Sequence, residues 1–159
     1  MARQKKADGI RLKGFFRVQL VNKKTGRVEG DTGYKKNVIT NFGFESCIAA
    51  LPFKGVTDSA QGSFMILGSG TVPATDAAGL DGSDTDQVSS FAGISVVDSL
   101  TQRVSQEFEG SDHSMTTLAN IGILVATSGP LVCGNTFDSS ELGAEQQVNC
   151  TYELRFSRV

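Results

Sequence analysis

Alternation between apolar and polar side chains is clearest near the end of the chain. In residues 148–157 every second side chain is apolar, beginning with Val148 and ending with Phe156. This two-residue period is typical of a strand with one buried face. A register shift of one residue would expose the whole apolar set, so the register of this strand is well specified.

Two earlier segments, residues 16–21 and 103–109, alternate in the same way and predict strands with one wet face. Residues 22–26 predict a tight hairpin loop after the first of these strands, with its glycine at a positive φ. The return strand is expected at residues 27–29. Another strand is expected at residues 34–39.

Two continuous apolar runs, residues 64–67 and 120–127, predict strands that are covered on both faces. Two glycines end the first run and Pro73 fixes φ, so we expect an extended surface loop as far as about Leu80. Residues 91–100 have no clear period but are apolar enough to return to the core.

One helix is expected, beginning at Asn41. This residue is a suitable N-cap, and Phe44, Ile48 and Leu51 share one face at spacings of four and three residues. Pro52 ends the pattern. A helix of three turns at most is not stable alone, so we expect it to pack against the sheet.

These elements amount to seven or eight strands and one short helix, without the strand–helix alternation that a parallel sheet requires. The 159 residues, with 18 glycines and no tryptophan, suit a single domain that needs no disulfide or metal to bury a core. We therefore predict a mainly β fold, an antiparallel β-sandwich of jelly-roll-like topology over residues 15–159. Residues 1–14 lack a period and predict an extended basic N-terminal arm.

Charge is distributed unevenly along the chain. Residues 1–36 contain eleven Lys or Arg and three acidic residues, a balance of +8, whereas the whole chain carries −2, so the remainder carries −10. Because opposite charges steer association, we expect the arm to contact an acidic face of another subunit. The expected arm contacts are Arg3, Lys5, Lys6, Arg11 and Lys13. The alternative is a solvated terminus that touches nothing.

Nucleic acid is a further possible ligand of the basic segment. Phe15 and Phe16 are the candidates for stacking on bases, and both suit a core better. The acidic remainder of the chain would repel a polyanion. We therefore do not expect nucleic acid as a partner.

Two segments contain residue types that bind ions. Residues 68–71 have the glycines of a phosphate loop, but Pro73 and Thr75 stand where the motif needs other residues, and no helical pattern follows. The next loop contains a candidate set of calcium ligands in a spacing unlike that of an EF-hand, so a solvated acidic loop is favoured. These acidic residues are Asp76, Asp81, Asp84 and Asp86.

No arrangement of residues predicts catalysis. His113 is the only histidine, and its acidic and serine neighbours are adjacent in sequence, so the three side chains point apart. Cys47, expected on the inner face of the helix, has no histidine-like base beside it. Buried free thiols are expected, with a Cys133–Cys150 bridge as the alternative. We expect no enzymatic activity and no cofactor.

Four segments, in matching order and covering about a third of the chain, share the patterns of a known group. Residues 37–44 with 48–50 are similar to its apolar strand, Thr-Asn-x-Gly and short helix. Residues 64–80 are similar to its apolar strand followed by Gly-x-Gly-Thr and Pro-Ala-x-x-Asp, and residues 120–123 and 151–156 resemble its late strands. On these segments the chain resembles small virion structural proteins of tailed bacteriophages, including head decoration (cement) and tail or fibre-base proteins.

The resemblance implies a virion structural protein that oligomerises, with a trimer among the expected forms, and binds the major capsid protein or other virion subunits. Head decoration that stabilises the capsid is the expected role, and a tail, collar or fibre-associated protein that recognises a receptor is the alternative. Glycan recognition has little support, because Tyr34 and Tyr152 lie in predicted strands and tryptophan is absent. Without an apolar stretch near 15 residues, we expect no signal peptide or membrane span, synthesis in the host cytoplasm and a final location in the virion.

Overall fold

The computed structural model describes residues 9–48, 62–83, 89–112 and 117–158. Sheet A consists of β1 (Ile10–Asn22), β2 (Val28–Asp31), β3 (Lys35–Lys36), β7 (Gly93–Asp98), β8 (Thr101–Glu109) and β11 (Gln146–Arg158). Sheet B consists of β4 (Val38–Ile39), β5 (Phe64–Gly68), β6 (Ser89–Ser90), β9 (Thr117–Leu124) and β10 (Leu131–Glu141). Two short helical elements are η1 (Gly43–Ile48) and η4 (Gly110–Asp112).

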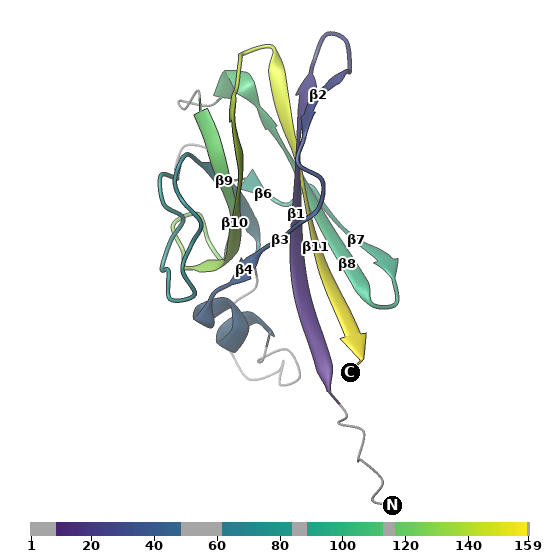
Figure 1. The fold of residues 1–159 in the computed structure, drawn as a ribbon, viewed down its shortest axis with the longest axis vertical. Helices are drawn as coiled ribbons and strands as arrows, with labels where there is room; N and C mark the ends of the chain where they lie inside the picture. Colours follow the sequence, from purple (N-terminus) through teal and green to yellow (C-terminus); the bar gives the residue numbers. More distant parts are fainter. Residues whose placement is uncertain (1–8, 49–61, 84–88, 113–116, 159) are drawn as a thin grey trace, which may run out of the picture.

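The two antiparallel sheets pack face to face (Figure 1). The strand order is β2-β1-β11-β8-β7 in sheet A, where β3 also pairs with β1, and β4-β10-β9-β5-β6 in sheet B. The prediction of a mainly β, antiparallel sandwich with one short helix is thereby confirmed.

The longest pairing joins the two ends of the chain. Strands β1 and β11 pair over 13 residues, and their alternating side chains give sheet A one inner face. Phe16 and Val148 on this face are 2% exposed and pack with Met65 and Leu67 of sheet B, which are fully buried. The alternating pattern at the end of the sequence therefore corresponds to a strand with one core face.

The hairpin after β1 is confirmed, with Gly26 at φ 68° and its amide donating to the Asn22 carbonyl at 2.8 Å. The single strand expected at residues 34–39 is wrong. Strand β3 pairs with β1 in sheet A, whereas β4 pairs with β10 in sheet B. The chain crosses between the sheets at the buried Asn37, so no continuous strand forms there.

The helix begins where expected, but its cap and its buried face differ from the prediction. Thr40 rather than Asn41 is the N-cap, because its Oγ1 accepts a hydrogen bond from the Gly43 amide at 3.0 Å. The wider π-helical turn of η1 turns Phe44 outward, where it is 57% exposed. Gly43 is required, since a Cβ there would lie 2.0 Å from the Val132 carbonyl oxygen.

Strand β5 is covered on both faces, as its continuous apolar run predicts. Met65 and Leu67 face the main core, whereas Ile66 packs with Leu80 on the other side of sheet B. Leu80 arrives there on the loop of residues 69–82, which contains no strand. The loop therefore serves as the outer cover of sheet B.

Asn120 of β9 ties this loop to the sheet. The side chain is fully buried, and its amide donates to the carbonyls of Thr71 at 3.2 Å and Asp81 at 2.8 Å. A buried amide bound to two loop carbonyls fixes the loop at both ends.

Residues 91–100 do not return to the core as predicted. Phe91 packs against the core, but β7 forms an edge of sheet A with Ile94 and Val96 each 72% exposed. Leu100, in the turn that follows, is 43% exposed. The apolar composition of this segment therefore reflects an exposed edge rather than a buried strand.

The last residues of the predicted arm are part of a strand in the structure. Residues 10–14 belong to β1 and pair with the end of β11, so Arg11 and Lys13 lie on a strand. The other arm contacts fall in residues 1–8, outside the described residues. They are Arg3, Lys5 and Lys6.

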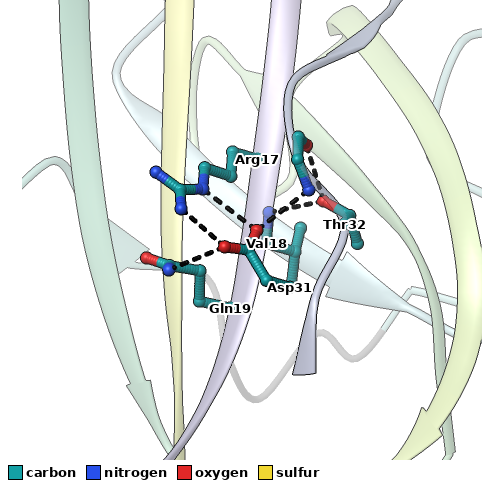
Figure 2. Close-up of polar contacts among 6 residues, drawn as sticks. Arg17, Val18, Gln19, Asp31 and Thr32 are labelled. Atoms are coloured by element: carbon teal, nitrogen blue, oxygen red, sulfur yellow. Dashed lines mark hydrogen bonds and ion pairs between the residues drawn. The ribbon is translucent and has the colours of Figure 1, made fainter. Parts of the chain in front are cut away.

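A carboxylate fixes the turn that leaves β2 (Figure 2). Asp31 Oδ1 accepts from Arg17 Nε at 3.0 Å and the Gly33 amide at 2.9 Å, and Oδ2 accepts from Arg17 Nη2 at 2.5 Å and Gln19 Nε2 at 3.0 Å. Thr32 Oγ1 accepts a further hydrogen bond from the β1 backbone at 3.0 Å. Hydrogen bonding to Arg17 is the largest cause that lowers the pKa of Asp31 from 3.8 to about 2.

Asp31→Asn is expected to lower the free energy of unfolding by about 1 kcal/mol at pH 7, because it removes the charge that Arg17 binds. Since the folded-state pKa is lowered, the contribution of the carboxylate is present above pH 3.8 and is lost as the pH falls through about 2. Urea unfolding of both proteins between pH 7 and pH 2 measures this convergence.

The matched control for this experiment is Asp138→Asn, whose exposed carboxylate lies 3.9 Å from Lys35. This variant is expected to unfold like the wild type, because isolated surface pairs contribute little. An Asp31→Asn deficit that stays constant down to pH 2 would contradict the role of the Asp31 charge.

Asn120→Ala is expected to lower the free energy of unfolding by about 2 kcal/mol, because two loop carbonyls lose their buried donor. Asn135→Ala serves as the control, since its amide makes one exposed hydrogen bond, to the Lys36 carbonyl. Hydrogen exchange should also accelerate in residues 69–82 of the Asn120 variant alone. Equal destabilisation by the two substitutions would show that Asn120 does not anchor the loop.

Candidate interaction surface

The outer face of sheet A begins with the residues of β1 that point away from the core. Arg11, Lys13, Phe15 and Arg17 occupy this face, because they alternate with the inner-facing residues of the strand. Three of these four side chains are cationic. The strand period therefore gathers part of the basic N-terminal charge on one side of the sheet.

Neighbouring strands add residues to the same face. In an antiparallel pair, residues directly opposite each other lie on one side of the sheet. Strand β11 places Arg155 opposite Lys13 and Glu153 opposite Phe15. Strand β8 then places Arg103 opposite Glu153.

Glu153 is 3% exposed, and two guanidinium groups hold its carboxylate. Oε1 accepts from Arg103 Nε at 3.0 Å and Nη2 at 2.6 Å, and Oε2 accepts from Arg155 Nε at 2.8 Å and Nη2 at 2.6 Å. Burial by itself would raise the pKa of Glu153, but hydrogen bonds from Arg103, Arg155 and Tyr34 together lower it. The carboxylate therefore stays ionised at neutral pH and fixes both arginines.

Two aromatic rings pack against the arginines. The guanidinium carbon of Arg155 lies 4.3 Å from the ring centre of Phe15 and 5.1 Å from that of Tyr34, and that of Arg17 lies 5.8 Å from Tyr34. Tyr34 precedes β3 rather than lying in a strand as predicted. Burial and the nearby Glu153 carboxylate raise its pKa, so the ring stays neutral.

We name this surface the basic face and define it by Arg11, Lys13, Arg17, Lys36, Arg103 and Arg155; Lys36 joins it opposite Phe15. Asp31 pairs with Arg17, and Glu153 pairs with both Arg103 and Arg155. The other three cations are exposed and form no ion pair within the described residues. The basic face therefore has an excess of positive charge, and three of its arginines, Arg17, Arg103 and Arg155, are held in place by carboxylates.

Sequence reasoning identified part of this face. Arg11 and Lys13 were among the predicted contacts, and the structure places them on it as strand residues. Arg103 and Arg155 were missed, although the alternation of their strands already assigned them to a polar face. They lie beside Lys13 because of the register between three strands, and the pattern of one strand alone does not determine that register.

The glycine-rich residues 68–71 do not form an open anion site. The Thr71 amide and hydroxyl donate to Asp81 Oδ2 at 3.2 and 3.3 Å. A Cβ on Gly70 would lie 2.3 Å from the Asp81 carbonyl oxygen, so close backbone contact explains this glycine.

Asp81, one of the predicted calcium ligands, is therefore bound to the loop itself. Asp84 and Asp86 lie outside the described residues, and Asp76 has no His, Cys, Asp or Glu cluster around it there. Within the described residues, no three His, Cys, Asp or Glu side chains gather to hold a metal ion.

The three cysteines are free thiols, with Cys133 and Cys150 buried and Cys47 half-buried. Burial raises the pKa of Cys47 and raises that of Cys133 to about 12, so these thiols stay protonated at neutral pH. Both line an apolar hollow of about 290 Å³ between the sheets. His113 lies outside the described residues.

Comparison of the chain with protein-family models, curated proteins and solved structures finds no match. Among the described helical segments, none has the length and apolar character needed to cross a membrane.

Glu153→Gln is expected to lower the free energy of unfolding by about 2 kcal/mol at neutral pH, because Arg103 and Arg155 lose their shared buried charge. The lowered pKa means that this contribution is present above the ordinary value of 4.5 and is lost as the pH falls through the folded-state pKa. Thermal unfolding at several pH values measures the difference.

Glu107→Gln is the control on the same face of sheet A, on the neighbouring strand β8, with an exposed carboxylate. It is expected to change stability by less than about 0.5 kcal/mol. If the two glutamate variants unfold alike at neutral pH, Glu153 does not hold the basic face together.

Proposed function

We propose that this chain is a bacteriophage virion structural protein, a head decoration (cement) protein that oligomerises and binds the major capsid protein. The resemblance of about a third of the sequence to such proteins supports this role. The observation that carries the proposal is the basic face, an excess of positive charge fixed on one sheet. The basic residues of positions 1–8 are continuous with it in sequence.

An acidic protein surface is the partner that suits the basic face. Arg11, Lys13 and Lys36 have no ion-pair partner among the described residues and can bind new carboxylates. Opposite charges accelerate association and orient the two surfaces. When several subunits dock together, weak attraction at each of them adds up to stable attachment, and binding stabilises the capsid.

Two features favour a protein partner over nucleic acid. Half of the cations of the basic face are already paired with Asp31 or Glu153. Arg155 also packs against the rings of Phe15 and Tyr34, which are the aromatic side chains beside the cations. Proteins that bind single-stranded nucleic acid use such rings as open stacking platforms.

Arg11→Glu combined with Lys13→Glu is expected to weaken binding to phage particles that lack the protein by at least roughly tenfold, because two attractive charges become repulsive. Cosedimentation of purified protein with such particles over a range of salt concentrations measures the effect. Wild-type binding should weaken as salt screens the charges.

Lys24→Glu combined with Arg27→Glu makes the same change in charge at the hairpin between β1 and β2, where Lys24 pairs with the exposed Glu145. This control should bind within roughly twofold of the wild type, since exposed pairs far from the contact contribute little. Equal losses from both double variants, or no loss from the first, would contradict a role for the basic face. Competition by free DNA at equal charge would favour a nucleic-acid ligand instead.

Electron microscopy of intact particles with a gold-tagged antibody against this protein tests the location. Label over the whole head surface is the expected result. Label confined to a vertex, collar, tail or fibre would replace head decoration by the tail-associated alternative. Particles without label would overturn the virion role.

A further inference from the structure

The edges of the two sheets differ in how well they are protected. In sheet B, β4 and β6 are edge strands of two residues each. In sheet A, β2 carries Glu29 and Asp31, and the free end of β1 carries Arg11 and Lys13. Short strands and charged residues are the usual devices that keep sheet edges from pairing with other chains.

Strand β7 has neither device. It is six residues long, pairs with β8 on one side and with no other described strand, and carries no charge before Asp98. Ile94 and Val96 are each 72% exposed, and Val97 is 46% exposed. An irregularity in register between Val96 and Asp98 leaves residues 93–96 as the regular part of the edge.

The exposed side chains of β7 continue an apolar surface. Ile94 and Val96 lie opposite Val104 and Gln102 of β8, which face the inside of the sandwich. Ile94, Gln102 and Val104 also line the apolar hollow between the sheets. A contiguous exposed apolar surface on a soluble domain commonly marks a contact with another protein.

We infer that β7 pairs antiparallel with β7 of a second copy of this chain, which joins the two A sheets across a two-fold axis. The inference rests on the proposed function, because it supplies the contact through which the subunits oligomerise. Backbone hydrogen bonds along the edge give the pairing its affinity, and the alternating side chains give its specificity.

A second copy suits this edge because the strand is complementary to itself. With the axis at Ser95, Ile94 of each copy lies opposite Val96 of the other, and the four side chains form one apolar cluster. Residues 93–97 contain no charge, so the pairing brings no like charges together. If β2 paired in the same two-fold way, the carboxylates of Glu29 and Asp31 would lie close to the same carboxylates of the second copy and repel them.

Charge substitution on β7 tests the inference. Ile94→Lys with Val96→Lys, and separately Ile94→Glu with Val96→Glu, place like charges opposite each other in a dimer of either variant. Each is expected to weaken self-association by roughly 100-fold. An equal mixture of the two variants is expected to associate, because lysines then face glutamates across the axis. Sedimentation equilibrium of the full chain measures all three samples.

Val28→Lys is the control, since Val28 is an exposed valine on the opposite edge strand of the same sheet. It should associate like the wild type. Amide hydrogen exchange in residues 93–97 should slow as the wild-type concentration rises and should not slow in the lysine variant. Association of the mixture also shows that both charged variants are folded.

A wild-type chain that stays monomeric, or charged variants that associate like the wild type, would overturn the inference. A mixture that stays monomeric would do the same. These results are independent of the particle experiment. Gold label on the head with a monomer in solution would leave head decoration standing without the β7 contact, whereas a β7 dimer with unlabelled particles would remove the proposed function.

Discussion

The pairing of β1 with β11 is the constraint on which the rest of the structure depends. The two strands come from opposite ends of the chain, yet their ladder is unbroken from Ile10–Arg158 to Asn22–Gln146. Thirteen opposed residue pairs fix which side chains share a face. The inner face supplies Phe16 to the core, and sheet B packs against it. Strands β2, β3 and β8 attach to this pair, so sheet A is built outward from the ladder (Figure 1).

The same ladder places two positive charges opposite each other and also supplies a carboxylate that pairs with one of them. Lys13 and Arg155 lie directly opposite each other, and like charges in such positions repel. Arg155 turns instead toward Glu153, which accepts two of its hydrogen bonds, and stacks over Phe15. A buried carboxylate is costly unless it is paired, and here two arginines pair it. Lys13 is left exposed without an ion pair within the described residues, so the geometry that stabilises the sheet also leaves a cation at its surface.

Local patterns were sufficient where one strand faces one environment. The alternation of residues 148–157 and the apolar run of β5 predicted both strands and their buried faces, because period and burial are properties of a single segment. The patterns failed where tertiary context decides. Residues 34–39 divide between two sheets, and β7 is apolar yet exposed at an edge. The basic face was predicted only in part for the same reason. Arg11 and Lys13 belong to a visibly basic segment, whereas Arg155 reaches the face through cross-strand register, which is a long-range property.

The strands of the two sheets differ in length, and the two sheets differ in how much of their surface is covered. Strands β1 and β11 have 13 residues each, whereas in sheet B β10 has 11, β9 has eight and β5 has five, so the strands of sheet B are shorter than the β1–β11 ladder. The sheets diverge toward the free ends of β1 and β11 (Figure 1), and the apolar hollow lies between them. The loop of residues 69–82 covers the outer face of sheet B with Leu80 and is held there by Asn120. The edge strands of sheet B, β4 and β6, are short. Sheet A has the basic face, the uncovered apolar positions and the unprotected edge. Under the proposed function and the inferred β7 pairing, the contacts with other subunits therefore lie on the outer face and the edge of sheet A, whereas the core lies on its inner face.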